Sequence, residues 1–354
     1  MKKRKLSKEA RFNLSNCFMS LFSNKRAIEA GKSMPIWSHA IVAVLAPALA
    51  LVPVIVGVAR TNGDNALSGT LYGFDKSVAL TMVDINNDND ELRVGEDHLL
   101  KYYKDGSEVT DTGALCMGEH INTQTQQYDI QVYYLRATDD KTVDDLYKEI
   151  NEVQYVIGTT TPKAPEDESG TKYYRPHYIF FHEKAFAVNI MANNSINAAA
   201  NFSGDYNHVP AGELIDRITK VNNVIPTTYE AASMPDYQKG LIENMKVFFN
   251  EAYIGIKGQT LLFSSTIYYG VYLGLVLFLG LLTFILTRSK KNFNSYLKWY
   301  QCMGIVAWAS ISPALLSLIL GFLLASMATM LFILLLGVRV MWLTMKQLSP
   351  TYTE

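Results

Sequence analysis

The residues from 84 to 97, DINNDNDELRVGED, concentrate carboxylates and asparagines as calcium-binding loops do. The first three ligand positions of a twelve-residue EF-hand loop match Asp84, Asn86 and Asp88. Such a loop also needs glycine at position six and a bidentate glutamate at position twelve, where this chain has Asn89 and Gly95. Because both requirements fail, and because Asn and Asp runs favour turns, we interpret the stretch as a solvated turn. Weak calcium binding on an outer surface is the alternative.

A second group of possible metal ligands consists of His177, His182 and Glu183. The segment around them has the pattern of a strand, and residues five apart on a strand point to opposite faces. The two histidines therefore need a bulge to chelate one ion, and the sequence contains no HExxH motif. We interpret the group as the surface of a hairpin. The aromatic run YYRPHYIFF at 173–181 is expected to pack within strands, and the alternative is that it stacks against sugar rings.

Motifs for nucleophilic or phosphate chemistry are absent from the sequence, which has no GxSxG, P-loop or GxGxxG arrangement. The three cysteines, Cys17, Cys116 and Cys302, are far apart and form no C-x-x-C pair. They support neither a disulfide framework nor a cysteine-based zinc site. We therefore expect a protein that is not an enzyme, with no catalytic, cofactor-binding or metal-binding residues and no bound cofactor.

Charge is segregated between two parts of the chain. Residues 1–35 carry nine Lys or Arg against two Glu, a net charge of +7. Residues 61–256 carry thirty Asp or Glu against fifteen Lys or Arg, a net charge of −15. This division indicates two compartments, with the basic segment in the cytoplasm and the acidic region outside. The aromatic side chains within the basic segment indicate either a helix at the membrane interface or a loosely ordered tail.

Long uncharged runs predict four membrane-spanning helices. About 20 apolar residues cross a hydrocarbon core, and the first run is 24 residues long without an Asp, Glu, Lys or Arg. The last run, from 300 to 345, is more than twice the length that a bilayer holds, so it must fold back. The predicted spans are residues 36–59, 261–286, 300–320 and 323–345.

Four spans place both termini in the cytoplasm, as the positive-inside rule requires for a basic loop at 287–299 and a tail at 346–354. Arg339 is the one formal charge inside the last span, and near a helix end its side chain can reach the interface. Since none of the spans contains an acidic partner, we do not expect an ion-coupled carrier.

The region at 60–256 is expected to form one α+β domain outside the membrane. Alternation and amphipathic spacing predict strands at 77–85 and 128–135, a hairpin at 178–191 that turns near residues 182–184, and helices at 143–157, 211–221 and 236–256. The composition of residues 158–172 predicts an exposed loop.

Three parts of the chain carry a resemblance to a known family. They are the basic, aromatic N-terminal segment that leads into KRAIEAGKSMPIWSHAIVAVL, the hairpin YIFFHEKAFAVNIM with SGDYNHVPAGELIDRI after it, and the third span with Pro313. Together they resemble Gram-positive membrane proteins labelled maltodextrin-utilisation proteins, which contain a domain of unknown function. The resemblance implies a non-catalytic accessory protein of the cell membrane that works beside carbohydrate uptake, with a sugar permease or ATPase of the ABC type as a possible partner.

Two other functions fit the same layout. Permease-like subunits of mechanotransmitting ABC systems also place a large outer domain between the first and second spans. They carry an acidic and basic coupling segment after the second span, whereas TRSKKNFNSYLKWYQCMG has no acidic residue. An extracytoplasmic sensor or scaffold is the remaining alternative. None of the three functions requires nucleic acid.

Overall fold

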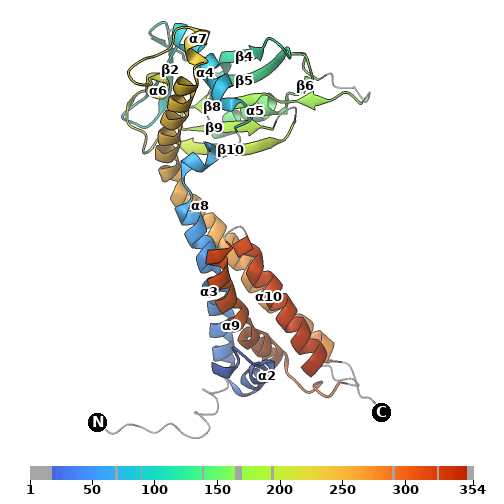
Figure 1. Cartoon of the computed structure of the whole chain (residues 1–354). Coiled ribbons are helices and arrows are strands. Elements are labelled where there is room, and N and C mark those ends of the chain that lie inside the picture. The colour runs from blue at the N-terminus through green and yellow to red at the C-terminus, as the bar shows by residue number, and fades with distance from the viewer. Residues whose placement is uncertain are drawn as a thin grey trace, which may run out of the picture. The chain divides into compact units, whose positions relative to one another are not determined.

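A computed structural model describes the chain in segments that together cover most of its length (Figure 1). The described residues are 18–67, 71–88, 90–137, 139–163, 170–192, 195–288, 292–324 and 327–348. The chain divides into two compact units, one made of Met1–Arg60 with Gln259–Glu354 and the other of Thr61–Gly258. We call the first the helical unit and the second the α+β unit, and we describe each by itself.

Four helices in the described part of the chain are long and apolar enough to cross a membrane. They cover Ile36–Arg60 (α3), Pro235–Thr287 (α8), Trp299–Leu323 (α9) and Ala328–Leu348, which comprises α10 (Ala328–Leu343) and a π-helical turn, η3 (Thr344–Leu348). The sheets of the α+β unit lie between the first and second of these helices in sequence. The prediction of four such helices around an α+β region is therefore confirmed.

The helical unit is organised around α9, which contacts α3, α10 and the shorter α2 (Asn24–Ser33) (Figure 1). Lipid tails are as apolar as leucine, so membrane helices depend on close packing rather than on hydrophobic burial. Small residues permit that packing here, because a Cβ at Gly304 would overlap the ring of His39. The indole Nε1 of Trp308 donates to His39 Nδ1 at 3.2 Å. Residues 1–17 of the basic segment lie outside the described residues, whereas 24–33 form a helix packed on α9.

Pro313 leaves one backbone carbonyl of α9 without its helical donor. A proline has no N–H to give to the carbonyl four residues earlier, which here is that of Ala309. Arg339 of α10 donates to this oxygen through Nη1 at 2.8 Å. The same guanidinium donates to Asn24 Oδ1 at 3.0 Å and to the carbonyl of Ser20. Arg339 thus joins α10, α9 and the segment before α3 through uncharged acceptors.

Asn294, in the segment between α8 and α9, links three parts of the helical unit. Its Nδ2 donates to the carbonyl of Leu348 at 3.2 Å, at the last described residue of the chain. The ammonium of Lys32 donates to Asn294 Oδ1 at 3.4 Å and to the hydroxyl of Tyr296 at 3.0 Å. The side chain of Asn294 is buried, so these bonds satisfy a polar group that water does not reach.

The α+β unit contains a five-stranded sheet with the order β10-β9-β8-β5-β4 and a smaller sheet with the order β11-β1-β2-β3. In the larger sheet β5 and β8 are parallel, and the other neighbours are antiparallel. The connection from β5 to β8 contains α5 (Asp140–Glu152) and a two-stranded ribbon, β6 (Tyr155–Val156) with β7 (Tyr173–Tyr174). The remaining strands are β1 (Asp90–Val94), β2 (Leu100–Lys104), β3 (Ser107–Glu108), β4 (Gly113–Asn122), β5 (Gln127–Arg136), β8 (His177–His182), β9 (Ala185–Met191), β10 (Ala198–Asp205) and β11 (Gly212–Glu213).

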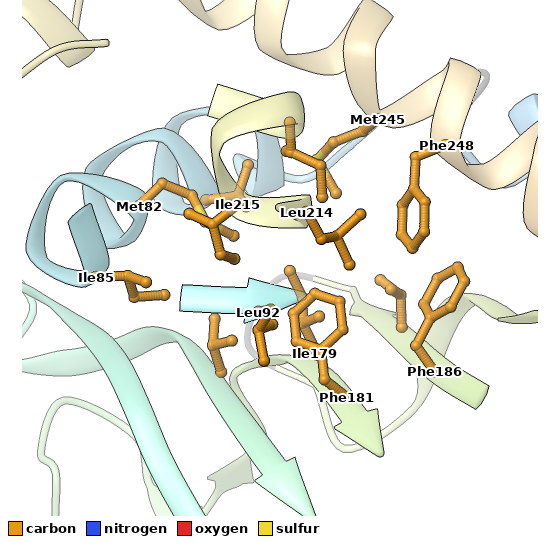
Figure 2. Packing of buried hydrophobic residues seen from close by; sticks show 14 of the residues in the cluster. Met82, Ile85, Leu92, Ile179, Phe181, Phe186, Leu214, Ile215, Met245 and Phe248 are labelled. Atoms are coloured by element: carbon orange, nitrogen blue, oxygen red, sulfur yellow. The ribbon is translucent and has the colours of Figure 1, made fainter. Parts of the chain in front are cut away.

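One face of the larger sheet packs against helices to form the main core. Ile179, Phe181 and Phe186 on the sheet meet side chains of α4 (Phe74–Asn87), α6 (Leu214–Thr219) and the first part of α8 (Figure 2). Strand residues of the opposite parity, such as Tyr178 and Phe180, pack with α5 on the other face. The short helices η1 (Gly63–Leu67) and α7 (Tyr229–Ala232) complete the described elements of this unit.

The strand predicted at 77–85 is wrong, because these residues lie within helix α4. The sequence SVALTMVDI is rich in β-branched and apolar residues, which favours a strand locally. In the structure almost all of these side chains are buried between the two sheets, α6 and α7, so the segment shows no polar face with a helical period. Tertiary packing overrides the local preference.

Other predicted elements are confirmed with changed limits. The strand at 128–135 and the hairpin at 178–191 correspond to β5 and to β8 with β9. The helix expected at 143–157 ends at Glu152, and the one expected at 211–221 covers only Leu214–Thr219, capped by the Glu213 side chain on the N–H of Ile215 at 3.1 Å. The helix expected at 236–256 is part of α8. Within the predicted loop at 158–172, residues 164–169 lie outside the described residues.

Candidate functional site

A polar cavity of about 320 Å³ lies at one end of the strands of the larger sheet. Four segments meet there: the start of α4, the β4–β5 turn with the start of β5, the residues that enter β8, and the end of β9. β5 and β8 are parallel, so both strands begin at this end of the sheet. The cavity is lined by Tyr72, Gly73, Lys76, Ser77, Asn122, Thr125, Gln127, Tyr128, Asp129, Tyr174, Arg175, Pro176, His177, Met191 and Ala192.

His177 fixes three of these segments to one another. Its Nδ1 accepts the N–H of Met191 at 3.0 Å, so the opposite nitrogen, Nε2, carries the ring proton and faces the carbonyl of Tyr72 at 3.2 Å. Its ring also lies edge-on to Phe74 at 5.5 Å. Burial lowers the pKa of His177 to about 4, so the neutral ring that these two bonds require is the stable form at neutral pH. His177 is therefore a positioning residue of the cavity.

The backbone turns sharply where the chain enters α4. Tyr72 and Gly73 both have positive φ, at 51° and 81°, a region that glycine adopts without strain. Gly73 occupies the N-cap position of α4 and has no side chain to accept the free N–H groups of the first turn. Across the cavity, Asn122 orders the β4–β5 turn by accepting the N–H groups of Gln124 at 3.0 Å and Thr125 at 3.2 Å.

The charged side chains of the cavity are Lys76, Arg175 and Asp129. Burial raises the pKa of Asp129, while nearby His120 and Lys76 and the amide of Asn122 act in the opposite direction. The ring of His120 is 4.0 Å from Asp129, and burial lowers its pKa in turn. With His177 neutral, the two cations and one carboxylate give the lining a net charge of +1.

Two buried polar groups of the cavity have no partner among the described residues. Gln127 is 8% exposed, and its Nε2 makes no hydrogen bond to a described residue. The Nε of Arg175 is also buried and also makes no such bond. A buried polar group without a partner costs about 1–3 kcal/mol, so these groups favour a ligand that supplies the missing bonds. The arrangement is suited to binding a small polar molecule.

The cavity includes some of the residues singled out from the sequence and leaves others out. Tyr174 and His177 of the aromatic run line it, whereas His182 and Glu183 are at the far end of β8, where Arg136 donates to Glu183 at 3.2 Å. His177 and His182 thus lie apart, and the described residues contain no cluster of three or more metal-ligating side chains. Sequence reasoning missed Lys76, Gln127 and Asn122, which only the tertiary fold brings together in the cavity.

The acidic stretch at 84–97 does not form the single turn that we expected. Asp84 is in the last turn of α4, where its Oδ1 accepts the hydroxyl of Tyr229 at 2.6 Å, while Asp90 begins β1 and is buried. The turn is confined to residues 95–98, with Gly95 N–H bonded to the Leu99 carbonyl at 2.9 Å. Residue 89 lies outside the described residues. The carboxylates are divided between a helix, a strand and a turn because α4 extends further than the sequence pattern indicates.

Comparison of the chain with family models, with curated proteins and with solved structures finds no match in any of the three.

Proposed function

We propose that this chain is a non-catalytic accessory protein of the cell membrane, with the α+β unit outside the cell and both termini in the cytoplasm. The cavity at the start of α4 is the observation that carries the proposal, since it combines phenol, amide and charged side chains with unsatisfied hydrogen-bonding groups. Sites for small molecules commonly place a few convergent polar groups in a concave pocket. In this proposal the α+β unit binds a small polar solute and the helical unit anchors it.

Carbohydrate uptake is the process in which we place this accessory role. The support comes from the resemblance to maltodextrin-utilisation proteins and from three tyrosines, Tyr72, Tyr128 and Tyr174, among the residues that line the cavity. Sugars are commonly held by aromatic faces together with amide and carboxylate groups, and Asn122 and Asp129 supply the latter here. The expected partner is a sugar permease or ATPase of the ABC type.

A mechanotransmitting subunit is the second candidate, and α8 is the observation that favours it. This 53-residue helix contributes Leu241, Met245 and Phe248 to the core of the α+β unit, and Tyr272 and Val276 to the core of the helical unit. A continuous helix that belongs to both cores is an element through which one unit could act on the other. The absence of an acidic coupling segment after α8 argues against this candidate.

Purification in mild detergent followed by mass spectrometry separates these functions. The chain is tagged at its C-terminus in its native host and crosslinked before solubilisation. Recovery of a sugar permease supports the accessory role, whereas recovery of an ATPase without a permease supports mechanotransmission. Recovery of neither refutes both and leaves a sensor or scaffold. An Arg175→Gln chain is the matched control, because it alters the cavity and leaves the helical unit unchanged.

A further inference from the structure

We infer that the cavity at the start of α4 takes a small anionic ligand, a sugar or similar hydroxylated solute that bears a carboxylate or phosphate group. The inference rests on the proposed function, because it names the ligand class of the same site. The anionic group would sit at the N-terminus of α4, between the side chains of Lys76 and Arg175.

The start of α4 has the features of an anion site. The first turn of a helix presents free N–H groups and the positive end of the helix dipole, which together attract carboxylate and phosphate. α4 is 14 residues long, and its N-cap, Gly73, has no side chain that could accept the N–H groups of the first turn. The N–H of Phe74 is bonded to the carbonyl of Leu71 at 2.9 Å, so the N–H groups of Asp75 and Lys76 are the ones that an anion would meet. His177 holds the carbonyl of Tyr72, just before this turn, and thereby fixes the direction of the N–H groups.

The buried groups without partners supply an independent observation. The Nε of Arg175 can only donate, so a ligand that satisfies it must bring an acceptor. Gln127, 8% exposed, lines the same cavity, and its Nε2, a donor, makes no hydrogen bond to a described residue and can donate to a ligand oxygen. The guanidinium fork matches the geometry of carboxylate and phosphate oxygens.

The charges that face this position come from three elements. α4 contributes Lys76, β5 contributes Asp129, and the segment before β8 contributes Arg175, whereas Asp75, also in the first turn of α4, is not among the residues that line the cavity. Asp129 lies beside His120 and Asn122, and its carboxylate can accept the hydroxyls of a sugar. An acidic sugar therefore places its anion against the two cations and its hydroxyls against the amides and Asp129. A neutral sugar leaves the donor of Arg175 without an anionic acceptor.

Isothermal titration of the full chain in detergent tests the inference with four probes: glucose, glucose 6-phosphate, glucuronate and inorganic phosphate. We expect at least one of the two acidic sugars to bind at least tenfold more tightly than glucose, and the affinity to fall with added salt. The two acidic sugars distinguish phosphate from carboxylate. Binding of inorganic phosphate alone would place the ligand outside the sugars and would overturn the hydroxylated part of the inference.

Matched variants locate the binding. Arg175→Gln and Lys76→Gln should each weaken the acidic sugar by about tenfold or more, as the loss of a hydrogen bond to a charged group predicts. Lys239→Gln, at an exposed lysine of α8 outside the cavity, should have no effect. Lys76 is exposed, so its variant tests binding without disturbing a core, and unchanged melting temperatures verify folding.

The outcomes separate this inference from the proposed function. Equal binding of glucose and the acidic sugars, failure of both acidic sugars to bind, or full affinity in both cavity variants each overturns the anion site. Glucose binding with no acidic sugar binding would leave a carbohydrate accessory protein and remove the anionic ligand. Acidic sugar binding by a chain that recovers no uptake protein would keep the site and remove the proposed function.

Discussion

The bond between Arg339 and the carbonyl that Pro313 leaves free makes a quantitative prediction for the helical unit. Arg339→Met keeps an unbranched side chain of similar length and removes the donors to Asn24, Ala309 and Ser20. Hydrogen bonds between membrane helices contribute about 0.6 kcal/mol each on average. Loss of all three should therefore lower the free energy of unfolding by about 2 kcal/mol.

A double-mutant cycle isolates one of the three bonds. Pro313→Ala restores a backbone N–H that can bond to the Ala309 carbonyl within α9, so this oxygen no longer needs Arg339. Arg339→Met should then cost about 0.6–1.7 kcal/mol less in the Pro313→Ala background than in the parent chain. The free energies are measured by reversible unfolding in mixed detergent micelles, followed by the helical circular dichroism signal.

Asn24→Ala provides the matched control for this cycle. It removes another acceptor of Arg339 that has no connection with the proline, so its cost should be the same with and without Pro313→Ala. If Arg339→Met costs as much in the Pro313→Ala chain as in the parent, the freed carbonyl does not account for the position of the guanidinium, and the reasoning is refuted.

Three further predictions concern topology, pH and calcium. In a cysteine-free chain within intact cells, a cysteine at Gln124 should react with an impermeant reagent and one added after Glu354 should not, whereas the reverse result would invert the proposed orientation. The pKa of His177 is about 4 when folded against an ordinary 6.5, so the neutral ring stabilises the fold fully above about pH 6.5 and this stability is lost as the pH falls toward 4. The loss due to His177 is about 3 kcal/mol, so His177→Asn should reduce the fall in unfolding free energy over this range by that amount, whereas His208→Asn, at an exposed control position, should not. Part of the fall should remain in His177→Asn, because burial also lowers the pKa of His182 to about 4. The full chain should melt within about two degrees in 1 mM calcium and in chelator, since a half-filled site adds only about 0.4 kcal/mol, and a shift of ten degrees that Asp84→Ala abolishes would reveal a dedicated site.

Some of the fold follows from the sequence because its signals are local. A run of 24 residues without charge identifies α3 by composition alone, and the alternation in YIFFHEKAFAVNIM identifies β8 and β9. α4 escapes the same reasoning because a helix buried on most sides loses its amphipathic period, and the β-branched content of 77–85 then favours a strand. A helix that starts at Phe74 also removes Asp84 from the acidic turn.

The cavity is a feature that no local pattern contains. Its lining comes from positions as far apart as Lys76, Gln127, Arg175 and Met191, which only the parallel pairing of β5 with β8 and the bond from His177 to Tyr72 bring together. The sequence signal that could have indicated it is Gly73 immediately before a helix, which is visible only once α4 is recognised as a helix. The run at 173–181 stands out in the sequence by its aromatic rings, whereas its arginine, Arg175, supplies the buried donor of the cavity.

The bonds of Asn294 set an order for the biogenesis of the protein. During translation Asn294 is synthesised before Leu348, whose carbonyl accepts from its side chain. Lys32 is synthesised earlier still, and it donates to Asn294 only after that residue has been made. Until residue 348 is synthesised, the buried Nδ2 of Asn294 therefore lacks the carbonyl of Leu348 as its acceptor. A variant truncated before residue 348 keeps this buried donor without that acceptor, at a cost of about 1–3 kcal/mol.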